Sequence, residues 1–259
     1  MLWSEYFNEM IGFFQTNNSF GDTIVTREMF IGHYAVALAA KKTAPKASMG
    51  ALVAAPILLD LIWPFFLLIG WEQVAITPNS NPFLRLEFVS YPISHGLVAV
   101  AGWAILYASL YFGITRYQRG ALVIAILVVS HWVLDYLVHR PDLPLYAASR
   151  QYGLGLWNHP KVTIVIEILM LAAGIAIYLQ QTRAKDRMGT YAFWAFAGGL
   201  LLSYAGATFA PPPGSVKALA LGTLLTWLFI PWGWWFDRHR ENRQPVSSPS
   251  KPVTTFARG

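Results

Sequence analysis

The sequence contains no cysteine and few charged residues. None of the 259 residues is Cys, which excludes a disulfide-stabilised scaffold. Asp, Glu, Lys and Arg make up 12% of the chain, whereas a typical soluble domain carries about 25%. Hydrophobic residues account for 55%, and the mean hydropathy is +0.43. This composition excludes disordered and collagen-like chains and indicates an integral membrane protein.

The chain has a basic charge balance, with a formal net charge of +6 and an isoelectric point near 9.5. The Lys and Arg residues lie between apolar runs and do not gather in one patch. That distribution is typical of residues that orient a protein in a membrane. We therefore expect the lipid bilayer as partner and no nucleic acid.

Six segments are long and apolar enough to span a bilayer, which takes about 20 residues in a helix. They are residues 50–71, 95–113, 120–138, 161–180, 190–210 and 216–236. A further apolar run, 29–40, is too short to span and is predicted to be a membrane-embedded half-helix. The expected fold class is all-α: a polytopic membrane helix bundle of about six transmembrane helices plus this short N-terminal helix.

Lys and Arg are unevenly divided between the two sides of the predicted bundle. One set of connections and ends holds thirteen of them: Lys41, Lys42, Lys46, Arg116, Arg119, Arg183, Lys185, Arg187, Arg238, Arg240, Arg243, Lys251 and Arg258. The alternating set holds five: Arg85, Arg140, Arg150, Lys161 and Lys217. This bias predicts that the C-terminus is cytoplasmic and that the long connections 72–94 and 139–160 face outside.

Several ionisable residues lie within the predicted spans, where a charge costs about 2.5–3.5 kcal/mol on insertion scales. They are the carboxylates Asp60, Asp135 and Glu167, and the imidazoles His33, His95, His131 and His139, which lie in or at the ends of apolar segments. Helical rise places most of them in the outer half of the membrane. We therefore expect one polar centre there.

The strongest local pattern is His131, Asp135 and His139, spaced at i, i+4 and i+8. At 100° per residue these side chains share an arc of about 80° on one helix face. Two imidazoles and a carboxylate suit zinc, or manganese or iron if more oxygens join. Structural readings remain open: His33 can be a hydrogen-bonded core histidine, and Glu167 can pair with Lys161 at the interface. Taken together, the three acids have no cation at their depth and favour a divalent metal.

Five short motifs along the chain are distinctive: FIGHYAVA at 30–37, LLDL at 58–61, YPISH at 91–95, SHWVLD at 130–135 and HRPDLP at 139–144. Together they resemble a known family, the membrane-bound metal-dependent hydrolases of bacteria. Some members of the family are inner-membrane proteins controlled by the DNA-damage repressor. The resemblance covers residues 29–183, which it implies are a hydrolase-like membrane core. It leaves 1–28 as an N-terminal extension, 184–237 as two additional transmembrane helices, and 238–259 as a basic tail expected to be disordered.

A more distant similarity is to the zinc-dependent phospholipase C and single-strand nuclease superfamily. Its metal ligands follow the order His, Asp, His, His-x3-Asp, His, which matches His33, Asp60, His95, His131, Asp135 and His139. The closing His-x3-Asp/Glu pair of that superfamily is missing, because His159 precedes Glu167 by eight residues. The resemblance implies a hydrolase with one or two zinc ions.

The expected function is hydrolysis of a phosphate ester by metal-activated water, at the inner membrane. Asp60, Asp135 and Glu167 are the candidate catalytic residues, and Arg140 or Arg150 is a candidate phosphate ligand. A site at lipid depth favours a lipid or lipid-linked substrate. Two alternatives stay open: a metal-ion or proton transporter that uses the same cluster, and a structural cluster that binds no metal. The apolar segments 121–129 and 169–178 favour a one-sided site over a continuous pathway.

Overall fold

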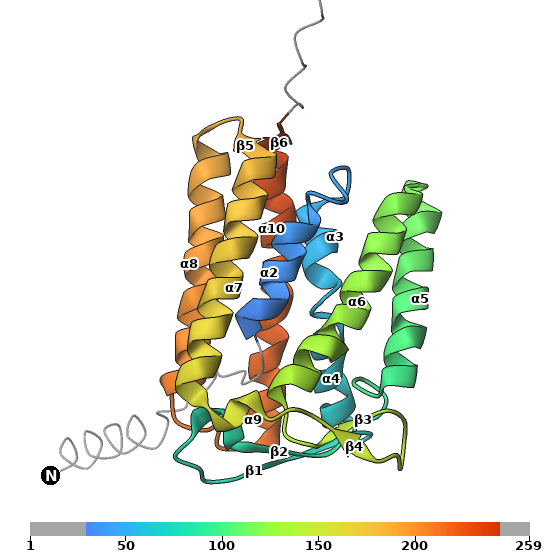
Figure 1. The fold of residues 1–259 in the computed structure, drawn as a ribbon, viewed down its shortest axis with the longest axis vertical. Helices are drawn as coiled ribbons and strands as arrows, with labels where there is room; N and C mark the ends of the chain where they lie inside the picture. The colour runs from blue at the N-terminus through green and yellow to red at the C-terminus, as the bar shows by residue number, and fades with distance from the viewer. Residues whose placement is uncertain (1–29, 244–259) are drawn as a thin grey trace, which may run out of the picture.

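The computed structural model describes residues 30–243, and this part of the chain is mostly helical. The predictions for residues 1–28, and those for the tail from residue 244 on, lie outside the described residues. Figure 1 shows an elongated bundle whose helices run roughly along its long axis, with short strands at both ends.

Five segments are helical, long and apolar enough to cross a membrane. Four are single helices: α5 (Leu97–Thr115), α6 (Gln118–Val138), α7 (Pro160–Gln181) and α8 (Arg187–Phe209). The fifth, Val216–Arg238, is a succession of α9 (Val216–Thr223), the 3-10 helix η4 (Leu224–Leu228) and α10 (Phe229–Arg238). They correspond to five of the six predicted spans, so a helical protein of membrane-spanning character is confirmed.

The remaining predicted span, 50–71, is not one helix. It forms α3 (Met49–Ala54) and α4 (Leu58–Leu68), separated by a turn over residues 55–57. The interruption occurs at Pro56, which has no backbone N–H to continue the helical hydrogen bonds. The short helix predicted at 29–40 is present as α2 (Phe30–Ala40). Neither α2 nor α4 reaches the length that a membrane span requires.

The connections contain three small antiparallel sheets, which an all-α prediction does not include. β1 (Gln73–Ile76) pairs with β2 (Leu86–Ser90), with η2 (Pro82–Leu84) between them, and β3 (Leu143–Pro144) pairs with β4 (Gln151–Tyr152). Both sheets lie at the lower end in Figure 1, and η3 (Leu156–Asn158) follows them in the chain. At the upper end, β5 (Thr182–Ala184) pairs with β6 (Arg240–Asn242). β6 lies within the segment 238–259 that is predicted to be disordered, so residues 240–242 differ from that prediction.

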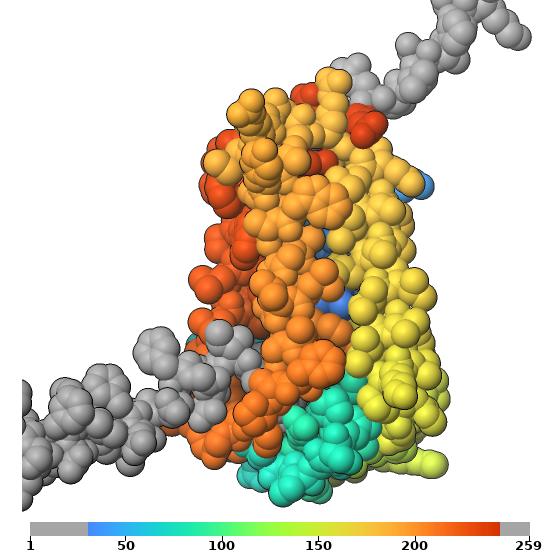
Figure 2. Space-filling view, turned by 90° about the vertical axis from the view of Figure 1, so that its left-hand side faces the viewer, coloured from blue at the N-terminus to red at the C-terminus, as the bar shows by residue number. Residues whose placement is uncertain are grey.

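The N-terminal helices α2 to α4 pack against the C-terminal helices α7, α9 and α10 in one core. α2 lies against α7, α3 against α10, and α4 against α9, so the two predicted additional transmembrane helices complete the bundle around the N-terminal elements. Figure 2 shows α7 and α8 side by side on one face, with only a small part of α2 visible between them. Large aromatic side chains fill the interior, among them Phe193, Phe196 and Phe236, whose rings meet edge to face.

Polar contacts hold the β5–β6 end of the bundle together. The Lys41 ammonium lies 2.8 Å from Asp237 and donates a second hydrogen bond to the Ala47 carbonyl. Asp237 also accepts hydrogen bonds from Tyr178 Oη and from the backbone N–H of Met49. Both members of this largely buried ion pair therefore make further hydrogen bonds, which is the condition under which burying two charges is tolerated.

We expect Gly174→Ala to destabilise the bundle. A Cβ on Gly174 of α7 would lie 2.5 Å from the Ala35 carbonyl oxygen of α2, so the two helices would have to separate. Overpacking of this kind costs about 1–3 kcal/mol. The measurement is thermal unfolding in detergent. Gly198→Ala on α8 is the matched control, because nothing lies within 4 Å of its added Cβ. An equal melting temperature for both variants would contradict the close α2–α7 contact.

Candidate metal centre

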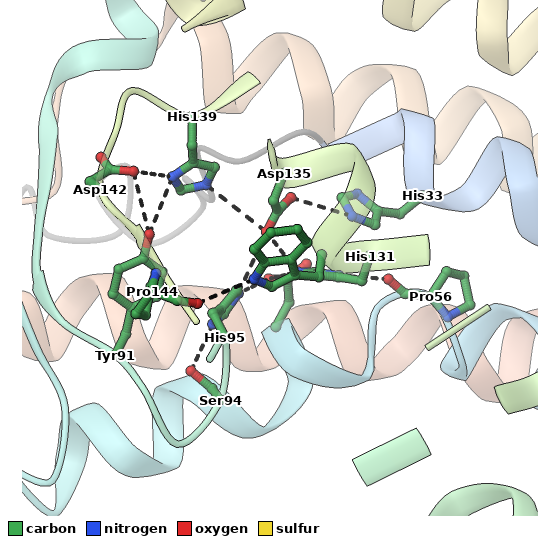
Figure 3. Close-up of polar contacts among 12 residues, drawn as sticks. His33, Pro56, Tyr91, Ser94, His95, His131, Asp135, His139, Asp142 and Pro144 are labelled. Carbon is green, nitrogen blue, oxygen red and sulfur yellow. Dashed lines mark hydrogen bonds and ion pairs between the residues drawn. The ribbon is translucent and has the colours of Figure 1, made fainter. Parts of the chain in front are cut away.

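Six of the residues singled out in the sequence come together at one place. His33 lies on α2, Asp60 on α4, His95 directly before α5, His131 and Asp135 on α6, and His139 at the C-terminal end of α6. Figure 3 shows the side chains of five of them, His33, His95, His131, Asp135 and His139, turned toward one another. Asp60 is 8% exposed and the other five are at most 1% exposed. The centre lies in the half of α6 nearer the β1–β4 loops.

Asp135 is the middle of the cluster. Its Oδ2 lies 3.0 Å from Nε2 of His131, 3.9 Å from that of His95 and 4.0 Å from that of His139. Its Oδ1 lies 3.5 Å from Nε2 of His33. One carboxylate thus faces four imidazoles, two of which, His33 and His95, come from outside α6.

Asp60 forms a second focus beside the first. Its Oδ1 lies 3.5 Å from Nε2 of His95 and 3.6 Å from Nε2 of His131. Two groups of three ligand atoms therefore fit within 4.8 Å: His33, His131 and Asp135, and Asp60, His95 and His131. His131 belongs to both groups, so the two foci are adjacent parts of one centre.

The Nδ1 atoms of three histidines face acceptors on the outside of the cluster. His131 Nδ1 lies 2.7 Å from the Pro56 carbonyl oxygen, and His139 Nδ1 lies 2.9 Å from Asp142 Oδ1. A carbonyl and a carboxylate oxygen only accept hydrogen bonds, so both Nδ1 atoms carry the proton. The Nε2 lone pairs of His131 and His139 are then available inside the centre. This backing of each ring is typical of metal-binding histidines.

His95 is oriented by a relay that ends at Glu72. Glu72 is buried; its Oε1 accepts from the backbone N–H of Ile93 and Ser94, and its Oε2 accepts from Ser94 Oγ at 2.6 Å. Because Ser94 donates its only proton to Glu72, its oxygen accepts from His95 Nδ1, 2.7 Å away. The Nε2 lone pair of His95 therefore also points inward.

The geometry suits a divalent cation. With bonds of about 2.0–2.1 Å, two ligand atoms of a tetrahedral site lie about 3.3 Å apart. The N···O distances of 3.0–4.0 Å between the imidazoles and Asp60 or Asp135 bracket this value. Neutral imidazole nitrogens and carboxylate oxygens both present lone pairs, so a cation between them removes their repulsion. The buried groups could hold a metal ion, and a nitrogen–oxygen donor set is one that zinc, manganese and iron accept.

Glu167 has a different setting from the other predicted catalytic residues. It is fully buried, and its Oε2 accepts a hydrogen bond from the backbone N–H of Ile31, in the first turn of α2. A carboxylate there is stabilised by the positive end of the helix dipole. Glu167 belongs to neither group of three ligand atoms. It positions α2, which carries His33, and its catalytic role stays a prediction. Arg140 and Arg150 lie in the α6–α7 connection, at the same end as the centre.

Aromatic rings from the loops cover the side of the centre that faces the β1–β4 end. The Trp157 ring lies 4.2 Å from His139, the Phe88 ring 4.9 Å from His139, and the Tyr91 ring 5.2 Å from His95, centroid to centroid. Tyr91 also lines a cavity of about 240 Å³ between the segments 89–92 and 144–151. The cavity at the loop end therefore reaches a residue that contacts two of the imidazoles.

Four residues that support the histidines were not predicted: Pro56, Glu72, Ser94 and Asp142. Asp142 has a local signal, since it follows His139 by three residues. Glu72 and Pro56 contact residues 22 and 75 positions away, so no local pattern reveals them.

Comparisons of the chain with protein-family models, with curated proteins and with solved structures find no match.

We expect Glu72→Gln to weaken metal binding by about 10- to 100-fold, the usual effect of losing a supporting group behind a metal-binding histidine. The amide NH₂ would donate to Ser94 Oγ, and Ser94 would then donate to His95 Nδ1. The His95 proton would move to Nε2, which could no longer bind a cation. Zinc titration measures the affinity, and ¹⁵N chemical shifts of the imidazole report the tautomer.

Glu87→Gln is the control for this change, because Glu87 lies on β2 of the same hairpin and is exposed. Unchanged zinc affinity and an unchanged His95 tautomer in Glu72→Gln would show that the relay does not set the ligand atom.

Proposed function

We propose that the chain is a metal-dependent hydrolase of the inner membrane that cleaves a phosphate ester with metal-activated water. The observation that carries this proposal is the convergence of imidazole Nε2 atoms on Asp60 and Asp135 inside a bundle of membrane-spanning character. The proposal includes membership of the membrane-bound metal-dependent hydrolases that residues 29–183 resemble. It also includes a six-pass topology, in which α3 and α4 form one interrupted pass and the C-terminus is cytoplasmic.

The residues divide into ligands and a group that faces the substrate. Asp135 is 1% exposed and lies within 4.0 Å of four imidazoles, so it is a ligand and not a proton acceptor for substrate. The Asp60 side chain is 11% exposed, against at most 2% for its imidazole neighbours His95 and His131. Asp60 therefore lies at the open edge of the centre. We assign to it the orientation of the attacking water and the acceptance of its proton.

A zinc-type ion, when bound, lowers the pKa of a coordinated water to about 7 and stabilises the negative charge that develops on a phosphoryl group. The chain supplies the environment for that chemistry. His33, His131 and Asp135 form one group of three ligand atoms and would hold the cation, with His95 and His139 within 4.0 Å of Asp135 beside them. The rings of Phe88, Tyr91 and Trp157 limit the access of bulk water. A phosphate ester can approach from the loop-side cavity at Tyr91, where Arg140 or Arg150 can bind its phosphate, or sideways from the bilayer.

We expect Asp135→Asn to lose the metal while still inserting and folding, because an amide neither carries the charge nor binds zinc well. Asp60→Asn should keep most of its metal and lose hydrolysis. Metal content of the detergent-purified proteins, measured by mass spectrometry, separates the two. If the cluster were only structural, the wild-type protein would contain no metal and Asp135→Asn would leave the metal content unchanged.

Activity is measured with a water-soluble aryl phosphate monoester, the corresponding diester and phosphatidic acid in mixed micelles. Hydrolysis of phosphatidic acid alone places the substrate in the membrane, whereas hydrolysis of the aryl esters places it in the aqueous phase. Metal uptake into liposomes that contain the protein, with no hydrolysis of any ester, would contradict the hydrolase and support a transporter.

Removal of the metal with a chelator should lower the melting temperature. Metal that binds the folded state at 100 times its dissociation constant stabilises that state by about 2.7 kcal/mol. Thermal unfolding with and without added zinc measures the shift. Asp135→Asn, which lacks the central ligand, should show no shift. An equal shift in the variant would mean that the stabilising zinc binds elsewhere.

A further inference from the structure

A groove runs between α5 and α6 at the end of the bundle opposite the β1–β4 loops. Its volume is about 810 Å³, within the range of about 300–1,000 Å³ of small-molecule sites. The small side chains that line it are Ala108, Ser109, Ala121 and Ala125, and the larger apolar ones are Ile105, Phe112 and Leu122. Two longer polar side chains, Gln118 and Arg119, lie at one end. The helical hairpin formed by α5 and α6 lies at the edge of the bundle in Figure 1.

The groove extends about as deep as one leaflet of a bilayer. On α6 it begins at Gln118, the first residue of the helix, and reaches Ala125, seven residues on. On α5 it reaches Ile105, ten residues before the last helical residue, Thr115. At about 1.5 Å per residue, these spans correspond to depths of roughly 10 and 15 Å. Half of a hydrocarbon core of about 30 Å is the depth of a single acyl chain.

Positive charge gathers at the shallow end of the groove, and no carboxylate among the described residues 30–243 forms an ion pair with it. Arg119 lines the groove, and the guanidinium of Arg116 stands 6.0 Å from the centroid of the Phe112 ring. Within residues 30–243, the ion pairs of Lys and Arg side chains are Lys41–Asp237 and Arg183–Glu241, and neither includes these two arginines. The one carboxylate in the hairpin, Asp135, is 16 residues from Arg119, about 24 Å along the helix.

We propose that this groove binds an anionic phospholipid, with its phosphate at Arg119 and one acyl chain between α5 and α6. The apolar lining accepts hydrocarbon, its depth matches one leaflet, and the arginines at the headgroup level complement a negative phosphate. Arg recognises phosphate through paired hydrogen bonds from its planar guanidinium. The site is at the opposite end of the bundle from the metal centre and does not depend on the proposed hydrolase activity.

Delipidated protein in detergent is titrated with phosphatidylglycerol and, separately, with phosphatidylcholine, and bound lipid is counted by native mass spectrometry. We expect one phosphatidylglycerol per chain, bound more tightly than phosphatidylcholine. Arg119→Gln should weaken phosphatidylglycerol binding about fivefold, the effect of one basic residue at an anionic membrane surface. Ala125→Phe, which fills the groove, should abolish the binding of both lipids.

Two variants that repeat these substitutions outside the groove serve as controls. Arg187→Gln removes an exposed arginine at the same end of the bundle, and Ala172→Phe enlarges an exposed alanine on α7. Both should bind lipid as wild type does. Equal lipid binding by the groove variants and the controls would overturn the proposal. A change of oligomeric state in Ala125→Phe, with unchanged lipid binding, would also overturn it and show that a second copy of the chain occupies the groove.

Discussion

The burial of two neighbouring carboxylates in a membrane-spanning bundle is the constraint on which the rest of the structure depends. Each charge costs about 2.5–3.5 kcal/mol at the centre of a bilayer, and the proximity of Asp60 and Asp135 adds repulsion. A cation between the imidazoles and the carboxylates would offset this cost. Imidazoles from α2, α6 and the segment before α5 surround both carboxylates, and the Nδ1 atoms of His95, His131 and His139 are held from outside. The interruption at Pro56, the relay through Glu72 and the loop that carries Asp142 all serve this orientation.

How much of this arrangement the sequence predicts depends on the range of the interaction. His131, Asp135 and His139 share one helix, so helical periodicity places them on one face. The five long apolar helices follow from apolar length alone. The interruption of the predicted span 50–71 is a local effect of Pro56, which a prediction based on apolar length does not take into account. The supporting partners of the imidazoles cannot be predicted in this way. Pro56 and Glu72 are brought to their histidines only by tertiary contacts, and β6 is brought to β5 in the same manner.

Glu167 is a deeply buried carboxylate with a setting of its own. It accepts a hydrogen bond at the first turn of α2, where the positive end of a helix dipole stabilises its charge. The sequence presents Glu167 and Asp135 as equivalent acids in apolar helices. The difference is that four imidazoles surround Asp135, whereas a helix N-terminus meets Glu167. Glu167 lies on α7 and holds the first turn of α2 through Ile31, so the position of His33 on α2 depends on α7.

The ion pair between Lys41 and Asp237 has a consequence for the order in which the protein is made. Chains are synthesised and inserted from the N-terminus, whereas α3 packs on α10 and Asn242 donates to the carbonyl of Pro45. Lys41 therefore lacks its carboxylate until residue 237 has been synthesised, and until then the Ala47 carbonyl and water are its acceptors. The helices α3 and α4 likewise gain their packing partners α10 and α9 only once the last span is made. A chain truncated before α10 lacks Asp237, so the lysine beside its apolar helices has no counter-charge from that residue.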